Sequence, residues 1–398
     1  MLDLTVKSIR LQIRLLCFGL ALTAGVCAAQ APVAERSPID PYLVVERFKF
    51  AMTDGAVMAP VQIGDRTRRF MLDTGARTSV VDKSLLVGAK SIKKGYNEGT
   101  KEAVELFAMP DGKLGAMDLR KAAPAVASVD LSKLSETLGF EVAGVLGFDF
   151  FSTRIVQIDF DREEVLILNK IPVKSGERVS VSYKSLARPT IKVKVADGKW
   201  EDFLIDTGVI GFDSGRLRPA LVESLLADSK GRVVGQTIDH ASGDQAATRL
   251  IQTRQIETAD QVTPQVVFGE HSENLLSLYY LSRYCVTLDL GHAKVFFDPG
   301  KRIRQPDYVD HSGLQLARRD GQAMIRSVLP GSPAAAAGLK AEDRILFFGE
   351  LRGDAGSLHV MRGALCAPDG VVPIVVRRAG QEFRISLRLG PATLDTTK

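Results

Sequence analysis

Two Asp-Thr-Gly triplets are the residues of this 398-residue chain best suited to chemistry. They begin at Asp73 and Asp206, and each ends an apolar run, FML before the first and FLI before the second. Such a run predicts a strand, and the glycine lets another segment pass close to the carboxylate on the turn. Two carboxylates brought together would share one proton, because neighbouring like charges do not both ionise cheaply. A pair of this kind can activate a water as general base and protonate a carbonyl as general acid, which is peptide hydrolysis without a metal or a covalent intermediate.

The flanks of the two triplets also match, which predicts a duplicated all-β lobe. Asp73 to Asp159 spans 86 residues and Asp206 to Asp289 spans 83, so the spacing is kept. Three blocks recur in the same order, and two of them read as a strand, a charged or glycine-rich turn and a second strand. The matched blocks are VQIGDRTRRFMLDTG (from 61) with VKVADGKWEDFLIDTG (from 193), GVLGFDFFSTR (144–154) with NLLSLYYLSRY (274–284), and IVQIDFDREEVLIL (155–168) with CVTLDLGHAKVFF (285–297).

The composition excludes several classes of protein. The length predicts two or three domains, and 45% hydrophobic with 25% charged residues is typical of a globular chain. A net charge of +5, dispersed along the chain, does not favour nucleic-acid binding. No His-Glu-x-x-His motif or zinc-type cysteine spacing occurs, so a metalloprotease is disfavoured and neither a metal nor a cofactor is expected.

The first 29 residues read as a secretory signal. A basic start is followed by an apolar run over 15–26 and by small residues that offer cleavage after Ala29 or Ala31. A membrane anchor is the alternative, although the run is shorter than the roughly 20 residues that a spanning helix needs. The sequence therefore predicts a periplasmic or secreted protein with no membrane span after signal removal. The cysteines that remain are Cys285 and Cys366, and we expect them to be two buried free thiols. A disulfide bond between them is the alternative in an oxidising compartment.

The run FMLDTGARTSVVD (70–82), followed by GVLGFDFF (144–151), resembles a lobe of a retropepsin-type aspartic protease. The duplication resembles bacterial two-lobed aspartyl proteases, and the resemblance covers residues 42–300. It implies a mainly β fold with lobes at 42–170 and 180–300, and a polypeptide substrate cut by an activated water. The site residues that it implies are Asp73 and Asp206 as the catalytic pair, with Thr74, Gly75, Ser79, Thr207 and Gly208 supporting it.

The second lobe departs from this pattern. No hydroxyl in Val209–Phe212 matches Ser79, and Ser277 stands where a glycine is expected. A non-catalytic, peptide-binding or scaffold protein that has lost the chemistry is therefore the alternative. A flap is expected between Lys94 and Leu114, and Trp200 is expected in the core or the cleft wall. Ser214, in the segment GFDSG, is expected to be a turn or cap residue.

After a polar stretch expected to be a linker (301–311), residues 312–390 resemble a bacterial PDZ domain. The segment PGSPAAAAG predicts a short helix with Ser332 as N-cap, Pro333 as first residue and Gly338 as stop. Strands are expected at 344–348, 371–378 and 382–389. The resemblance implies capture of peptide C-termini by a carboxylate-binding loop, with a purely structural packing module as the alternative. The loop residues are Ser312, Gly313, Leu314, Gln315 and Leu316.

Overall fold

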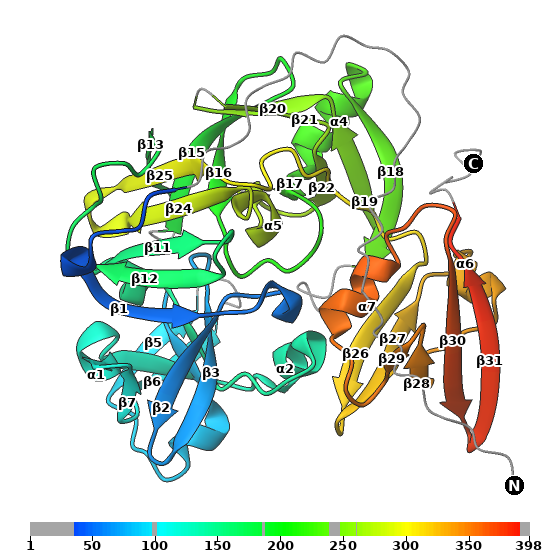
Figure 1. Cartoon of the computed structure of the whole chain (residues 1–398), viewed down its shortest axis with the longest axis horizontal. Helices are drawn as coiled ribbons and strands as arrows, with labels where there is room; N and C mark the ends of the chain where they lie inside the picture. The colour runs from blue at the N-terminus through cyan, green and yellow to red at the C-terminus, as the bar shows by residue number, and fades with distance from the viewer. Residues whose placement is uncertain (1–35, 98–101, 185–187, 239–246, 260, 391–398) are drawn as a thin grey trace, which may run out of the picture. The chain divides into compact units, whose positions relative to one another are not determined.

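The computed structural model describes residues 36–390 except 98–101, 185–187, 239–246 and 260. The predicted signal segment, residues 1–29, lies outside the described residues. The described chain is mainly β, as predicted, with short helices between the strands (Figure 1). Within it, no helix is both long enough and apolar enough to cross a membrane.

Residues 42–170, the first lobe, contain a nine-stranded sheet in the order β5-β6-β9-β4-β10-β3-β2-β7-β8. Strand β10 runs parallel to β3, which places Leu146 opposite Leu72, and β4 runs parallel to β9. The strands are β2 (Met58–Ile63), β3 (Arg66–Leu72), β4 (Val80–Asp82), β5 (Lys93–Asn97), β6 (Glu102–Ala108), β7 (Gly112–Leu114), β8 (Met117–Asp118), β9 (Ala125–Val129) and β10 (Gly144–Leu146).

Residues 180–300, the second lobe, contain a sheet with the same order, strand for strand: β18-β19-β22-β17-β23-β16-β15-β20-β21, with β14 (Ser182–Lys184) added beside β15. The parallel pairs also recur, β23 with β16 and β17 with β22. The strands are β15 (Arg188–Val195), β16 (Trp200–Ile205), β17 (Gly215–Leu217), β18 (Gly231–Ile238), β19 (Ala247–Thr253), β20 (Gln255–Thr258), β21 (Gln261–Pro264), β22 (Val267–Glu270) and β23 (Leu275–Leu276).

A six-stranded sheet joins the two lobes. Its order, β1-β12-β11-β24-β25-β13, takes one hairpin from each lobe and pairs them antiparallel through β11 and β24 (Figure 1). Gln157 lies opposite Thr287 at the middle of this contact and donates a 2.9 Å hydrogen bond to its hydroxyl. The strands are β1 (Val44–Lys49), β11 (Ile155–Asp159), β12 (Glu164–Leu168), β13 (Glu177–Ser180), β24 (Tyr284–Asp289) and β25 (Lys294–Pro299).

Residues 312–390, which we call the C-terminal module, form a separate sheet in the order β26-β27-β28-β30-β31, with β29 beside β28. The short helix α6 (Pro333–Ala336) begins and ends as predicted, because the Ser332 hydroxyl accepts a hydrogen bond from Ala335 N and Gly338 has a positive φ of 78°. The strands are β26 (Leu314–Arg319), β27 (Gln322–Val328), β28 (Arg344–Phe348), β29 (Leu351–Arg352), β30 (Val371–Arg378) and β31 (Gln381–Arg388), and a second helix is α7 (Leu358–Ala364).

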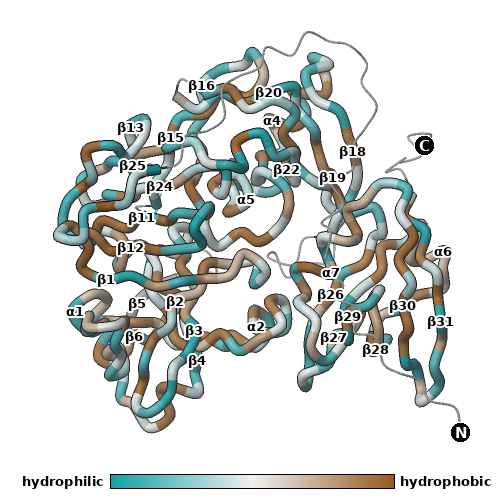
Figure 2. The backbone as a smooth tube through the Cα atoms, in the orientation of Figure 1, coloured by the Kyte–Doolittle hydropathy of each residue, from teal (hydrophilic) through white to brown (hydrophobic). Residues whose placement is uncertain are grey.

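The helices of the lobes are short, and apolar residues gather on the strands between them (Figure 2). A large core runs through both lobes and the shared sheet, whereas the C-terminal module has an apolar core of its own. The α-helices are α1 (Leu119–Ala122), α2 (Ser132–Leu138), α3 (Phe148–Phe151), α4 (Pro219–Ala227) and α5 (Leu278–Leu281), and the 3₁₀ helices are η1 (Pro41–Leu43), η2 (Met52–Asp54), η3 (Lys83–Leu86) and η4 (Leu290–His292).

Two details differ from the sequence-based expectations, and one agrees. Trp200 is not in the core, one of its two expected places: it is 44% exposed at the start of β16, where its ring packs against the Lys194 ammonium. The polar stretch expected to be only a linker contributes a fully buried carboxylate, Asp307, to the second lobe. Cys285 and Cys366 are both buried, as predicted, and no disulfide joins them to each other.

Candidate active site

Each catalytic candidate stands immediately after a strand, held from one side by a neighbouring parallel strand. Asp73 follows β3 and donates its N–H to Leu146 O of β10 at 3.0 Å. Asp206 follows β16 and donates to Leu276 O of β23, also at 3.0 Å. The same backbone support therefore fixes both turns, and each aspartate keeps part of its surface exposed.

The two threonines bind the turns to each other by a reciprocal set of buried hydrogen bonds. Thr74 N donates to the Thr207 hydroxyl at 3.0 Å, and Thr207 N donates to the Thr74 hydroxyl at 3.1 Å. Each hydroxyl then donates across the interface, Thr74 to Ile205 O at 2.6 Å and Thr207 to Leu72 O at 2.8 Å. Both threonines are fully or almost fully buried, so water does not compete for these four bonds.

The glycines bring the carboxylates together. A Cβ atom added to Gly75 would lie 2.3 Å from an Asp206 carboxylate oxygen, and one added to Gly208 would lie 2.4 Å from the Asp73 carboxyl carbon. No side chain fits at those distances. Each glycine therefore leaves space beside its own turn for the carboxylate of the other lobe. The two Asp-Thr-Gly triplets thus meet in one site.

The environment of the dyad is unequal. Asp73 accepts hydrogen bonds from the N–H groups of Gly75 (2.8 Å) and Ala76 (3.0 Å), whereas Asp206 accepts one from Gly208 (2.9 Å). Burial raises the pKa of Asp73, and its backbone donors oppose that rise. Burial and the neighbouring Asp73 charge raise the pKa of Asp206 well above its usual range. The two carboxyls are therefore coupled, and the charged form is disfavoured more strongly at Asp206 than at Asp73.

Ser79 supports the first turn through the carboxylate of Asp149, a residue that the sequence pattern did not single out. The N–H and hydroxyl of buried Ser79 both donate to one oxygen of Asp149, at 2.9 and 2.7 Å, and the Ser79 hydroxyl accepts from Gly147 N. Ser79 has no hydrogen bond to Asp73 itself among those of the described chain. Its effect on the dyad passes through the backbone between residues 73 and 79.

The second lobe has the same arrangement, built from residues that the sequence comparison did not pair. Ser214 lies directly before β17, as Ser79 lies directly before β4, and its N–H and hydroxyl donate to Asp307 at 3.0 Å each. The expectation that this lobe lacks a matching hydroxyl is therefore wrong: the hydroxyl comes two residues later than in the first lobe. The sequence could have indicated Ser214, because it is a serine immediately before a short strand. It could not have indicated Asp307, because that residue lies beyond the repeat.

Asp307 is tied to the fully buried guanidinium of Arg283 and accepts a 2.6 Å hydrogen bond from Val267 N. Burial raises the pKa of Asp307, and the Arg283 charge opposes the rise. The segment between the second lobe and the C-terminal module thus completes the support of the turn that carries Asp206.

The serine in place of a glycine, Ser277, is accommodated locally. At Gly147, a Cβ would lie 2.7 Å from Ala76 O, so the first lobe excludes a side chain there. The Ser277 hydroxyl instead donates to Asp213 O at 2.5 Å and accepts from Tyr280 N as the N-cap of α5. The longer loop between Asp206 and Ser214 provides this space, and the dyad geometry is kept.

The loop expected to bind carboxylates, Ser312–Leu316, enters β26 with its first donors already used. The Ser312 N–H and hydroxyl both donate to Asp310 at 2.6 Å, and Leu314 N donates to the Ser312 hydroxyl at 2.9 Å. Burial raises the pKa of Asp310 to about 6, against the hydrogen bonds from Ser312. Leu314, Gln315 and Leu316 pair with β27.

The expected flap region of the first lobe, Lys94 to Leu114, contains most of the hairpin β5–β6 and strand β7. The hairpin β18–β19 takes the place of β5–β6 in the second sheet. The tips of both hairpins, 98–101 and 239–246, lie outside the described residues. Phe107, in β6, packs against the main core. Among the residues that the structure describes, no cluster of three or more His, Cys, Asp or Glu is arranged to hold a metal ion.

Searches against protein-family models and against curated proteins find no match to this chain.

Proposed function

We propose that this chain is an exported aspartic endopeptidase with two retropepsin-like lobes and a C-terminal PDZ-like module. The observation that carries the proposal is the reciprocal bonding of Thr74 and Thr207, which sets Asp73 and Asp206 face to face on two turns of the same design. The repeated strand order of the two sheets supports the duplicated fold. The basic, apolar and small-residue pattern of 1–29 supports export to the periplasm or beyond.

The unequal hydrogen bonding of the dyad suggests the roles. A water held between the carboxylates gives a proton to ionised Asp73 as its oxygen attacks the peptide carbonyl carbon, while Asp206 gives its proton to the carbonyl oxygen. The tetrahedral intermediate then collapses: Asp73 passes its proton to the leaving nitrogen, the C–N bond breaks, and Asp206 recovers a proton from a hydroxyl. Atoms and charges balance without a cofactor, and the substrate is an extended polypeptide.

The PDZ-like assignment rests on the sequence resemblance of residues 312–390 and on the sheet order, in which β26 is the strand at the edge. An edge strand beside a helix is the place where an extended peptide adds to a sheet. The module's ligand would be a peptide C-terminus or another peptide carboxylate.

Cleavage of an unfolded protein mixture from acid to neutral pH tests the catalytic proposal. The variants are mature wild type, Asp206→Asn and the matched control Asp197→Asn, which changes an exposed aspartate on a turn of the same lobe. We expect Asp206→Asn to lose at least about a thousandfold in kcat/KM, and Asp197→Asn to cleave like wild type.

Equal cleavage by wild type and Asp206→Asn would remove Asp206 from the mechanism. Absence of cleavage by folded wild type at every pH would favour the alternative, a peptide-binding scaffold.

A further inference from the structure

The edge strand of the C-terminal module is covered by a helix of the first lobe. Helix α2 lies against both β26, the edge strand, and α7, the helix beside it (Figure 1). Arg362 of α7 donates to Thr137 O at the end of α2 and to Leu316 O of β26, both at 2.7 Å. One guanidinium thus joins α2 to the strand edge that an added peptide would use.

The contact is rich in charge-assisted bonds. Glu136 of α2 pairs with Arg319 of β26 and Arg326 of β27, at 3.1 Å each. Arg326 also donates to the Thr137 hydroxyl at 3.0 Å. Three arginines therefore face one carboxylate and the carbonyl end of a helix, where positive charge is favourable. This is the chemistry that would recognise a peptide carboxylate.

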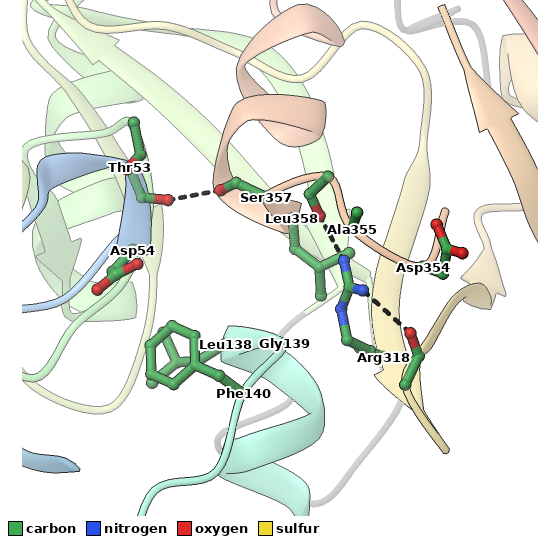
Figure 3. Close-up of a pocket in the computed structure, with 12 residues that line it drawn as sticks. Thr53, Asp54, Leu138, Gly139, Phe140, Arg318, Asp354, Ala355, Ser357 and Leu358 are labelled. Carbon is green, nitrogen blue, oxygen red and sulfur yellow. Dashed lines mark hydrogen bonds between the residues drawn. The ribbon is translucent and has the colours of Figure 1, made fainter. Parts of the chain in front are cut away.

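The first lobe accepts α7 through two glycines in left-handed backbone. Gly55 has φ 75°, and a Cβ there would lie 2.7 Å from the His359 ring; Gly139 has φ 87°, and a Cβ there would lie 3.0 Å from Leu358. The Ser357 hydroxyl donates to Thr53 O at 2.5 Å (Figure 3). The lobe surface is thus shaped to the start of α7.

The interface between the first lobe and the C-terminal module, which we call the seam, contains no apolar core that runs through both parts. The apolar core of the module draws only on residues of 314–389, and the buried clusters of the lobes draw only on residues of 48–297. A cavity of about 360 Å³ opens at the seam, lined on the lobe side by Asp54 and Phe140 and on the module side by Arg318 and Leu358 (Figure 3). Relative motion of two domains is the general expectation where the interface between them is polar rather than large and hydrophobic.

Helix α2 is also one packing layer from the dyad. Leu138 shares a buried cluster with Met71, two residues before Asp73, and with Val145 of β10. Ala76 and Ile210, which follow the two catalytic turns, pack on the same cluster. A change at α2 therefore reaches both turns through contacting side chains.

We propose that the Arg319, Arg326 and Arg362 face of the module is a peptide-carboxylate site that helix α2 of the same chain occupies. Docking on α2 and capture of a carboxylate-bearing peptide exclude each other, so a captured peptide releases the module from the first lobe. The release frees α2 beside the catalytic turns. This inference rests on the PDZ-like role proposed for the module and does not depend on the chemistry of the dyad.

Hydrogen exchange and peptide binding test the proposal on the mature full chain in an Asp206→Asn background, which prevents cleavage of the probe. The variants are the unsubstituted background, Glu136→Arg, Arg326→Glu and the charge swap that combines both. We expect each single change to speed amide exchange in α2 and α7 about tenfold or more. The swap rebuilds the pair of residues 136 and 326 but leaves Arg319 facing an arginine, so it should restore part of the protection. Exchange in α4 of the second lobe should stay unchanged, which shows that the variants are folded.

The probe is the synthetic peptide SKLSETLGF, the chain's own residues 132–140, with a free C-terminal carboxylate. Glu136→Arg opens the site and leaves its arginines in place, so it should bind the probe at least about tenfold more tightly than the docked background. Arg326→Glu opens the site but damages it, so it should bind more weakly than Glu136→Arg. Unchanged exchange in both single variants, or equal binding by the background and Glu136→Arg, would overturn the proposal. Neither readout requires proteolytic activity, so its failure differs from failure of the protease assignment.

Discussion

Replacing Thr207 by valine tests whether the threonine bonds hold the dyad together. The change keeps the shape of the side chain but removes its hydroxyl, which deletes the bonds from Thr74 N and to Leu72 O. Thr74 and Leu72 are both 0% exposed, so water does not replace the lost partner. An unsatisfied buried group costs about 1–3 kcal/mol, so we expect a loss of about 2–5 kcal/mol in the free energy of unfolding.

The single tryptophan makes this loss of stability measurable in the second lobe, which contains Thr207. Trp200 begins β16, the strand that ends at the Asp206 turn, so its fluorescence reports unfolding of the second lobe in urea. A loss of this size would lower the melting temperature by roughly 5–15 °C. We also expect kcat/KM to fall about a hundredfold, because a small displacement of a catalytic group has effects of that order.

Thr207→Ser is the matched control, since it keeps the hydroxyl and removes one methyl group, worth about 1 kcal/mol. It should retain most of the stability and the activity. A Thr207→Val protein with the urea midpoint and kcat/KM of wild type would refute the structural role assigned to these bonds.

Three further predictions concern the surroundings of the dyad. Because the folded pKa of Asp206 is raised, its contribution to stability is present below the unfolded pKa near 3.8 and is lost as pH rises through the folded pKa. The stability of Asp206→Asn relative to wild type should therefore increase when the pH is raised from about 4 to about 8. The same difference in melting temperature between the two proteins at pH 4 and at pH 8 would contradict this. A chain ended after residue 311 keeps Asp307, whereas a chain ended after residue 300 leaves the buried Arg283 without this carboxylate. The free energy of unfolding of the shorter chain in urea should therefore be lower by about 3–5 kcal/mol. Identical urea midpoints for the two chains would argue against the support by Asp307. Gly75→Ala should abolish cleavage, because its Cβ meets the Asp206 carboxylate. Gly390→Ala, whose nearest contact is at 3.6 Å, should cleave normally, and activity in Gly75→Ala would show that the turns do not lie as described.

Much of the site was predictable because it depends on short-range pattern. Short apolar runs predicted the strands before Asp73 and Asp206, and the duplicated blocks predicted that the two turns belong to similar environments. The N-cap at Ser332 and the stop at Gly338 were predictable for the same reason, since local backbone chemistry decides them. The match between Ser79 and Ser214 was missed because two extra residues shift the second hydroxyl along the chain.

The sequence by itself determined the strands, the repeat and the two carboxylates, because strand periodicity and turn chemistry act over a few neighbouring residues. Only the tertiary structure decided which distant groups meet. Asp307, beyond the repeat, reaches Ser214 and Arg283, and Glu136 reaches Arg326 across 190 positions of chain. These pairings depend on how sheets and the module pack in three dimensions, and no local pattern of charge or hydrophobicity records that packing.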